Sequence, residues 1–256
     1  MKQKPKTLTA LLLCVLMAIG FLAVLAGCGS SGQNDAASGS EIEEKTKTES
    51  AKTIDGGWEM SSNKSAALPK DVQTAFDKAT EKFTGSDLKP VAYIAEQVVA
   101  GKNYMLLCEA TPTTAEPQSK YQMAVIYADL DGNAEITSIK DFELNKYLDT
   151  SGEQKEQEEL AGGWNVPKET AGSAIPANAQ AAFDKAVKTF TGSTIEPIAL
   201  LQTQVVAGTN YAFICRSTPA VQNPVPVIQI VKVYEDLESN AEISNICTID
   251  PADYNG

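Results

Sequence analysis

The chain contains no histidine. An imidazole is the general base of Ser–His and Cys–His catalytic arrangements, and it is a ligand in most zinc sites. Paired carboxylates could still carry acid–base chemistry, but the acidic residues are scattered through linkers and turns, and no apolar segment surrounds a pair of them. The sequence therefore predicts that the protein is not an enzyme, and nothing in it calls for a metal or a cofactor.

Basic residues are also in short supply. The sequence has 21 lysines and arginines against 33 aspartates and glutamates, which gives a net charge of −12. Residues 1–27 hold three lysines and no acidic residue, so a chain without them is more acidic still. Such a charge repels phosphate groups, which argues against nucleic acid as a partner and against binding to anionic lipid by charge.

The first residues have the pattern of an export signal. Three lysines are followed by an apolar run over residues 10–26, which ends in Leu25-Ala26-Gly27-Cys28. This ending resembles the lipobox of bacterial lipoproteins, which implies cleavage after residue 27 and attachment of lipid, including palmitate, to Cys28. The alternative is an uncleaved transmembrane anchor, because the run is slightly long for a signal. Either interpretation predicts a chain held at the cell membrane and facing outside the cytoplasm.

Residues 28–53 follow this signal. They are rich in Ser, Gly, Asp, Glu, Lys and Thr and nearly free of large apolar side chains. A segment of this composition cannot bury enough apolar surface to become ordered. We expect a disordered tether that holds the folded part away from the membrane.

The remainder of the chain is a tandem repeat. Gln-Val-Val-Ala-Gly occurs at Gln97–Gly101 and again at Gln204–Gly208, and both copies run on into Asn-Tyr. Each copy lies downstream of a Gly-Gly-Trp, and between residues 75–112 and 182–219 the two copies are identical at 21 of 38 positions. This pattern indicates a duplicated domain, with copies over residues 54–148 and 160–256. Residues 149–159 are all polar and mostly charged, which predicts a linker or a frayed helix. We therefore expect two independent domains, like beads on a string.

Each copy shows one helix. In the first copy apolar residues recur at helical spacing from Val72 to Phe83, with Pro69 before them and Gly85 after them as the expected C-cap. The second copy repeats the pattern from Ala179 to Phe190.

The other regular segments resemble strands. A short strand is expected after each Gly-Gly-Trp, and turn signals separate the four longer candidates of each copy. The longer candidates are 91–99, 104–110, 121–127 and 135–142 in the first copy, and 198–206, 211–217, 227–234 and 242–249 in the second. The order β-α-β-β-β-β predicts an α+β fold in which an antiparallel sheet of four to five strands wraps one helix.

Cysteine is rare in this part of the chain. Cys108 and Cys215 are repeat equivalents, whereas Cys247 has a lysine at its counterpart. Export permits a disulfide between Cys215 and Cys247, but the expected topology places a strand between theirs, which exceeds the reach of a disulfide. We favour buried free thiols over a disulfide.

The strand order, the Gly-Gly-Trp and the Gln-Val-Val-Ala-Gly-x-Asn-Tyr hairpin together resemble the cystatins, which inhibit papain-like cysteine proteases. The resemblance covers both copies. It implies that three segments of each copy form a wedge and enter the protease cleft without covalent chemistry. They are the N-terminal trunk, which is the segment at the Gly-Gly, the first hairpin, which carries the Gln-Val-Val-Ala-Gly motif, and the second hairpin, which is formed by the last two strands. The protease-binding residues that it implies are Gly56, Gly57, Gln97, Val98, Val99, Ala100, Gly101 and Leu130 in the first copy, and Leu160, Ala161, Gly162, Gly163, Gln204, Val205, Val206, Ala207, Gly208 and Leu237 in the second.

The sequence departs from the cystatin pattern at the second hairpin. Cystatins carry Pro-Trp there, whereas this chain has Asp-Leu-Asp around Leu130 and Asp-Leu-Glu around Leu237. The target protease could belong to a host, to a competitor or to the producing cell. The alternative function is a surface binding or adhesion lipoprotein that is built on cystatin-like modules and inhibits nothing.

Overall fold

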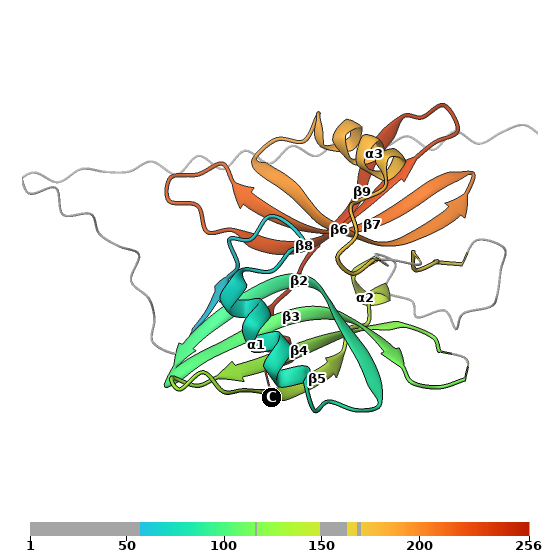
Figure 1. Cartoon of the computed structure of the whole chain (residues 1–256). Helices are drawn as coiled ribbons and strands as arrows, with labels where there is room; N and C mark the ends of the chain where they lie inside the picture. The colour runs from blue at the N-terminus through green and yellow to red at the C-terminus, as the bar shows by residue number, and fades with distance from the viewer. Residues whose placement is uncertain (1–56, 116, 149–162, 168–169, 256) are drawn as a thin grey trace, which may run out of the picture. The chain divides into compact units, whose positions relative to one another are not determined.

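The computed structural model describes residues 57–115, 117–148, 163–167 and 170–255. It shows an α+β protein with two antiparallel sheets, one for each repeat (Figure 1). The predicted signal at 1–27, the tether at 28–53 and the linker at 149–159 lie outside the described residues. Within the described residues, no helix has both the length and the apolar character needed to cross a membrane.

The first sheet is a five-stranded meander in the order β1-β2-β3-β4-β5. Its elements are β1 (Trp58–Met60), α1 (Lys70–Thr80), β2 (Ser86–Val99), β3 (Gly101–Pro112), β4 (Lys120–Ala128) and β5 (Ala134–Asp141). The strands are those the sequence predicts, although most are longer. Pro90 lies within β2, where it cannot donate to a ladder, and the pairing with β3 shifts register beside it.

The second sheet repeats this arrangement with four strands in the order β6-β7-β8-β9. Its elements are α3 (Ala177–Val187), β6 (Ser193–Val206), β7 (Gly208–Pro219), β8 (Val227–Glu235) and β9 (Ala241–Thr248). The expected short strand after Gly-Gly-Trp is reduced to a single bridge between Asn165 and Thr203. The order β-α-β-β-β-β is thus confirmed in the first repeat and incomplete in the second.

Each helix covers one face of its own sheet. The apolar stripe of α1, formed by Val72, Ala75 and Phe76, packs against side chains of β2 to β5. Figure 1 shows the helix lying across this face of the sheet. Ala182 and Phe183 of α3 do the same in the second repeat. The expected C-cap is wrong by several residues, because α1 ends at Thr80 with Glu81 as its cap. Gly85 instead supplies a left-handed backbone, with φ of +98°, directly before β2.

The opposite faces of the two sheets share one core. Tyr121 of the first repeat donates a hydrogen bond to the Leu201 carbonyl of the second at 2.7 Å. We call this cluster the shared core. It includes Val91, Ile94, Met105, Leu107, Tyr121 and Met123 from the first repeat and Ile198, Leu201, Ile214, Ile228 and Ile230 from the second. The expectation of two independent domains is therefore wrong, because the described residues of both repeats belong to one compact unit.

Two short helices that the sequence analysis missed join the ends of the repeats. They are α2 (Asn145–Leu148) and a 3-10 helix, η1 (Pro251–Tyr254). Tyr147 and Tyr254 share a hydrogen bond of 2.9 Å between their hydroxyls. The ring of Phe142 stacks on Tyr147, with the centroids 5.0 Å apart. These aromatic contacts link the C-terminal ends of the two repeats beside the shared core.

The three thiols in the described part of the chain are free. Cys108 and Cys215 are fully buried on the helix side of their sheets, while Cys247 is half-buried. Strand β8 separates Cys215 from Cys247, as expected. In addition, Cys247 lies opposite Ile230 of the shared core, so these two thiols project from opposite faces of the sheet.

Candidate functional site

The two hairpins of each repeat end at the same edge of their sheet. In the first repeat, the β2–β3 turn and the β4–β5 turn are neighbours because Lys102, next to the first turn, pairs with Ala128 at the start of the second. Strand β1 begins nearby, with Trp58 opposite Gln97. The structure thus brings together the hairpin residues at 97–101, Leu130 and Gly57. In the second repeat it brings together residues 204–208 and Leu237.

Each first hairpin closes through a glycine that the fold requires. Gly101 has φ of +125° and Gly208 has φ of +124°, a region that side chains rarely adopt. A Cβ at Gly101 would lie 2.3 Å from the Ala128 carbonyl oxygen, and one at Gly208 would lie 2.2 Å from the Glu235 carbonyl oxygen. The glycine of the repeated motif is therefore needed for the close approach of the next strand.

The Gln and Asn of the motif also have a role in the hairpin itself. Asn103 donates a hydrogen bond from Nδ2 to Oε1 of Gln97 at 2.7 Å, across the β2–β3 ladder. Asn210 and Gln204 make the equivalent bond at 2.8 Å. Each pair fixes the register of its hairpin close to the tip.

A tyrosine that the sequence analysis did not assign to the site holds each tip. The hydroxyl of Tyr127 on β4 donates to the Ala100 carbonyl at 2.6 Å, and Tyr234 on β8 donates to the Ala207 carbonyl at the same distance. The available signal was that both tyrosines occupy equivalent positions of the repeat. The tips are thus tied to the neighbouring strand.

The valines of the motif have no such folding role. Successive side chains of a strand point to opposite faces, yet Val98 and Val99 are both about two-fifths exposed, at 42% and 41%. Val205, at 66%, is more exposed than its counterpart Val98. Both faces of each tip therefore present apolar surface to the solvent.

The second turn of each repeat is stiffened by an aspartate. The carboxylate of Asp129 accepts hydrogen bonds from the backbone N–H and the side-chain amide of Asn133, both at 2.8 Å. Asp236 and Asn240 repeat this arrangement. The hydrogen bonds from Asn133 and Asn240 lower the pKa of Asp129 and of Asp236, so both carboxylates are charged at neutral pH. A lysine from the helix adds a further tie, because Lys78 Nζ donates to the Gly132 carbonyl at 2.6 Å.

These turns display one leucine each. Leu130 is 87% exposed and Leu237 is 83% exposed. Large apolar side chains at such exposure stabilise no core. The leucines lie at the sheet edge that also carries the exposed valines, so each repeat presents an apolar edge made of two valines and one leucine.

The two apolar edges differ in charge. In the first repeat Lys102 pairs with Glu96 at 3.1 Å beside the tip, and Tyr93 donates to the same carboxylate. Threonines 203 and 209 occupy the equivalent positions of the second repeat. The second tip therefore lacks this lysine–glutamate pair and instead has the acidic Glu235 opposite Thr209, whereas the first tip is flanked by an ion pair.

The N-terminal trunks are described only in part. Gly57 and Gly163 are described, whereas Gly56, Leu160, Ala161, Gly162 and the expected lipidation residue Cys28 lie outside the described residues. Trp58 and Trp164 pack against the shared core, and the Trp58 indole N–H donates to the Asn255 side chain. The trunk of the first repeat is thus tied down from Trp58 onward.

Among the described residues, no group of three or more cysteine, aspartate or glutamate side chains is placed to hold a metal ion. The chain matches no protein-family model and no curated protein.

Proposed function

We propose that this chain is a membrane-anchored, reversible inhibitor of papain-like cysteine proteases that blocks the protease cleft with the apolar edges of two cystatin-like repeats. The anchor is the lipidated Cys28. The contact residues are the motif residues at 97–101 and 204–208, Leu130 and Leu237, with the trunk glycines beside them.

The exposed valines and leucines carry this proposal. In each hairpin the Gln, the Gly and the Asn serve folding, through a cross-strand hydrogen bond and a close backbone approach. The valines and the leucine belong to none of the core clusters of the described residues. They are held out on turns that Tyr127, Tyr234, Asp129 and Asp236 tie to the sheet. A stiff apolar edge loses little entropy when it enters a narrow cleft, and burying it releases water.

The second candidate is a surface binding or adhesion lipoprotein with no inhibitory activity. One observation favours it: the Gln, Gly and Asn of the motif are accounted for by folding alone. The repetition of the motif then needs no protease. In this case the same apolar edges contact a different partner, and the protein leaves papain active.

Titration of papain with a chain of residues 29–256 tests the proposal. The whole unit is used because the shared core spans both repeats. The informative variant replaces Val98, Val99, Val205 and Val206 with Asn. A matched control replaces Val221 and Val225 with Asn, since both are also exposed, at 62% and 71%, but lie in the β7–β8 loop at the far end of the sheet.

We expect inhibition by the parent chain and by the control, and at least a tenfold loss in the hairpin variant. Lost apolar contacts at the centre of an interface cost about 1–2 kcal/mol each. If the parent chain leaves papain and related proteases fully active at micromolar concentration, the inhibitor proposal fails and the binding-module proposal stands. If all three chains inhibit equally, the hairpins are not the contact surface.

A further inference from the structure

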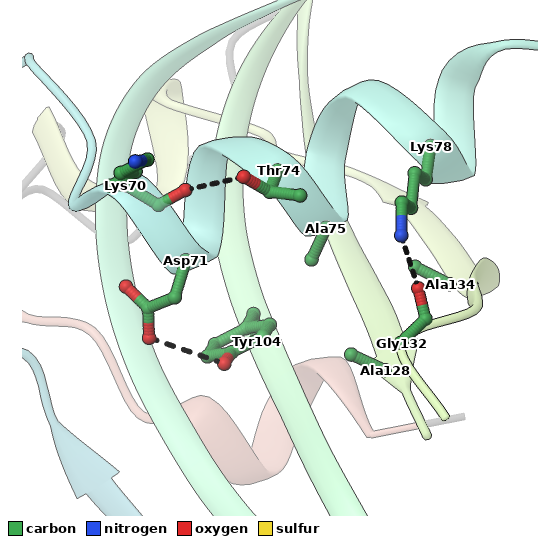
Figure 2. Close-up of a pocket in the computed structure, with 9 residues that line it drawn as sticks. All are labelled: Lys70, Asp71, Thr74, Ala75, Lys78, Tyr104, Ala128, Gly132 and Ala134. Carbon is green, nitrogen blue, oxygen red and sulfur yellow. Dashed lines mark hydrogen bonds between the residues drawn. The ribbon is translucent and has the colours of Figure 1, made fainter. Parts of the chain in front are cut away.

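A cavity lies between α1 and the second turn of the first repeat. Its volume is about 520 Å³, which is within the range of small-molecule sites. Figure 2 shows that Tyr104 points into it from the sheet, with Asp71 and Lys78 on the helix above. The lining residues are Lys70, Asp71, Thr74, Ala75, Lys78, Tyr104, Ala128, Gly132 and Ala134.

The second repeat shows what occupies the equivalent space. The position of Ala128 is taken by Glu235, and the positions of Tyr104 and Lys78 by Tyr211 and Lys185. The Glu235 carboxylate accepts a hydrogen bond from the Tyr211 hydroxyl at 3.1 Å and lies 3.8 Å from Lys185 Nζ. In the second repeat, therefore, a carboxylate of the chain itself lies between the helix lysine and the sheet tyrosine.

The first repeat retains the tyrosine and the lysine but has lost this carboxylate. Ala128 and Ala134 leave an apolar floor, and Ala75 faces it from the helix above. The Tyr104 hydroxyl makes only a long hydrogen bond, 3.4 Å, to Asp71. Burial raises the pKa of Tyr104, so its hydroxyl stays protonated and can donate at neutral pH.

The residues that line the cavity carry one more positive charge than negative charges, which slightly favours an anion. Lys70 and Lys78 line it, against the single acid Asp71, and the ion pair of Lys102 with Glu96 lies beside Tyr104. Asp71 is replaced by Asn178 in the second repeat, where Glu235 fills the space. Asp71 is therefore the group that opposes a bound anion.

We propose that this cavity binds a carboxylate on a short aliphatic stem, which takes the place that Glu235 holds in the second repeat. The stem lies over Ala128 and Ala134 and under Ala75 of the helix. The carboxylate accepts hydrogen bonds from the Tyr104 hydroxyl and from Lys78. Either a free dicarboxylate or an acidic side chain of a partner protein has this chemistry. The inference does not rest on the proposed protease inhibition, although the cavity shares the β4–β5 turn with Leu130 of the apolar edge.

The test is an NMR titration of residues 29–256 with glutarate, and in parallel with a short acetylated peptide whose central residue is glutamate. Backbone amides of Ala128, Gly132 and Ala134 report on the cavity. Ala128→Glu should fill the cavity with the side chain that the second repeat already tolerates and weaken binding at least tenfold. Asp71→Asn should tighten binding about threefold or more, since it removes a like charge from the site. Glu235→Ala should create a second site, reported by the amides near residue 235.

Tighter binding of glutarate than of the peptide assigns the site to a free dicarboxylate, and the reverse assigns it to a protein side chain. Both results support the site. The proposal is overturned if neither probe gives saturable shifts at tens of millimolar, or if Ala128→Glu binds as well as the parent chain. A urea unfolding curve for each variant shows whether it is folded during the titration.

Discussion

Replacing Gly208 with alanine should destabilise the protein far more than the same replacement at two other glycines of the second repeat. The added Cβ would lie 2.2 Å from the Glu235 carbonyl oxygen and 3.1 Å from the Asp236 Cα. Both are backbone atoms, so β8 has to move away from β7. The φ of +124° adds strain for any side chain. Backbone strain of this kind costs about 1–3 kcal/mol, and forced displacement of packed elements costs a similar amount. We therefore expect a loss of roughly 3–4 kcal/mol in the free energy of unfolding.

Two other glycines of the second repeat allow the cost of backbone strain to be measured separately from the cost of displacing β8. Gly192 has φ of +91° and nothing within 4 Å of its added Cβ, so Gly192→Ala should show the strain alone. Gly163 has an ordinary backbone and open space, so Gly163→Ala should be close to neutral. The measurement is equilibrium urea unfolding of residues 29–256. If Gly208→Ala costs no more than Gly192→Ala, the close approach of β8 does not explain why this motif has a glycine.

Three further predictions rest on the structure, and a fourth rests on the sequence alone. A chain of residues 54–148 alone exposes its half of the shared core, so sedimentation should find it associated or unfolded, and a stable monomer would contradict the shared core. Under the proposed function, Leu237→Trp should tighten inhibition of papain, because the exposed leucine would take the place of an aromatic anchor worth on the order of 2 kcal/mol; unchanged inhibition with the fold intact would remove this turn from the interface. Burial raises the pKa of Cys108 to about 12 and that of Cys215 well above its usual value, so iodoacetamide should label Cys247 first in the folded chain, as read by mass spectrometry. Cys28→Ala should abolish palmitate labelling in cells, and continued labelling would refute lipidation at this residue.

The local elements were predictable because their signals are local. The helical spacing of Val72, Ala75 and Phe76 indicates α1, and the turn residues after Val99 and Ala128 indicate the hairpins. The strand bounds were less accurate, since the ladder continues past the apolar run wherever backbone partners remain. Both Pro90 and Pro197 lie inside strands for this reason.

One pattern in the sequence does indicate the shared core, although the prediction of two independent domains did not take it into account. Met105, Leu106, Leu107 and Cys108 form a continuous apolar run, whereas a strand with one face in water alternates apolar and polar residues. Such a run indicates a sheet buried on both faces. The helix can cover only one face, so the other face needed a second partner.

The positions of the candidate contact residues followed from the repeat, but their roles did not. The motif identifies residues 97–101 and 204–208 without showing which of them face solvent. The structure divides them into Gln97 and Gly101, which serve the hairpin, and Val98 and Val99, which remain exposed.

The sequence by itself determined the duplication, the element order and the absence of histidine chemistry, since each depends on residue identity and on spacing along the chain. The tertiary structure alone decided which faces are covered, which tyrosine holds each tip and which repeat keeps an open cavity. Tyr127 and Ala100 are distant in sequence, and so are Ala128 and the helix that roofs its cavity. Only the packing of strands and helix brings these groups within hydrogen-bonding or contact distance.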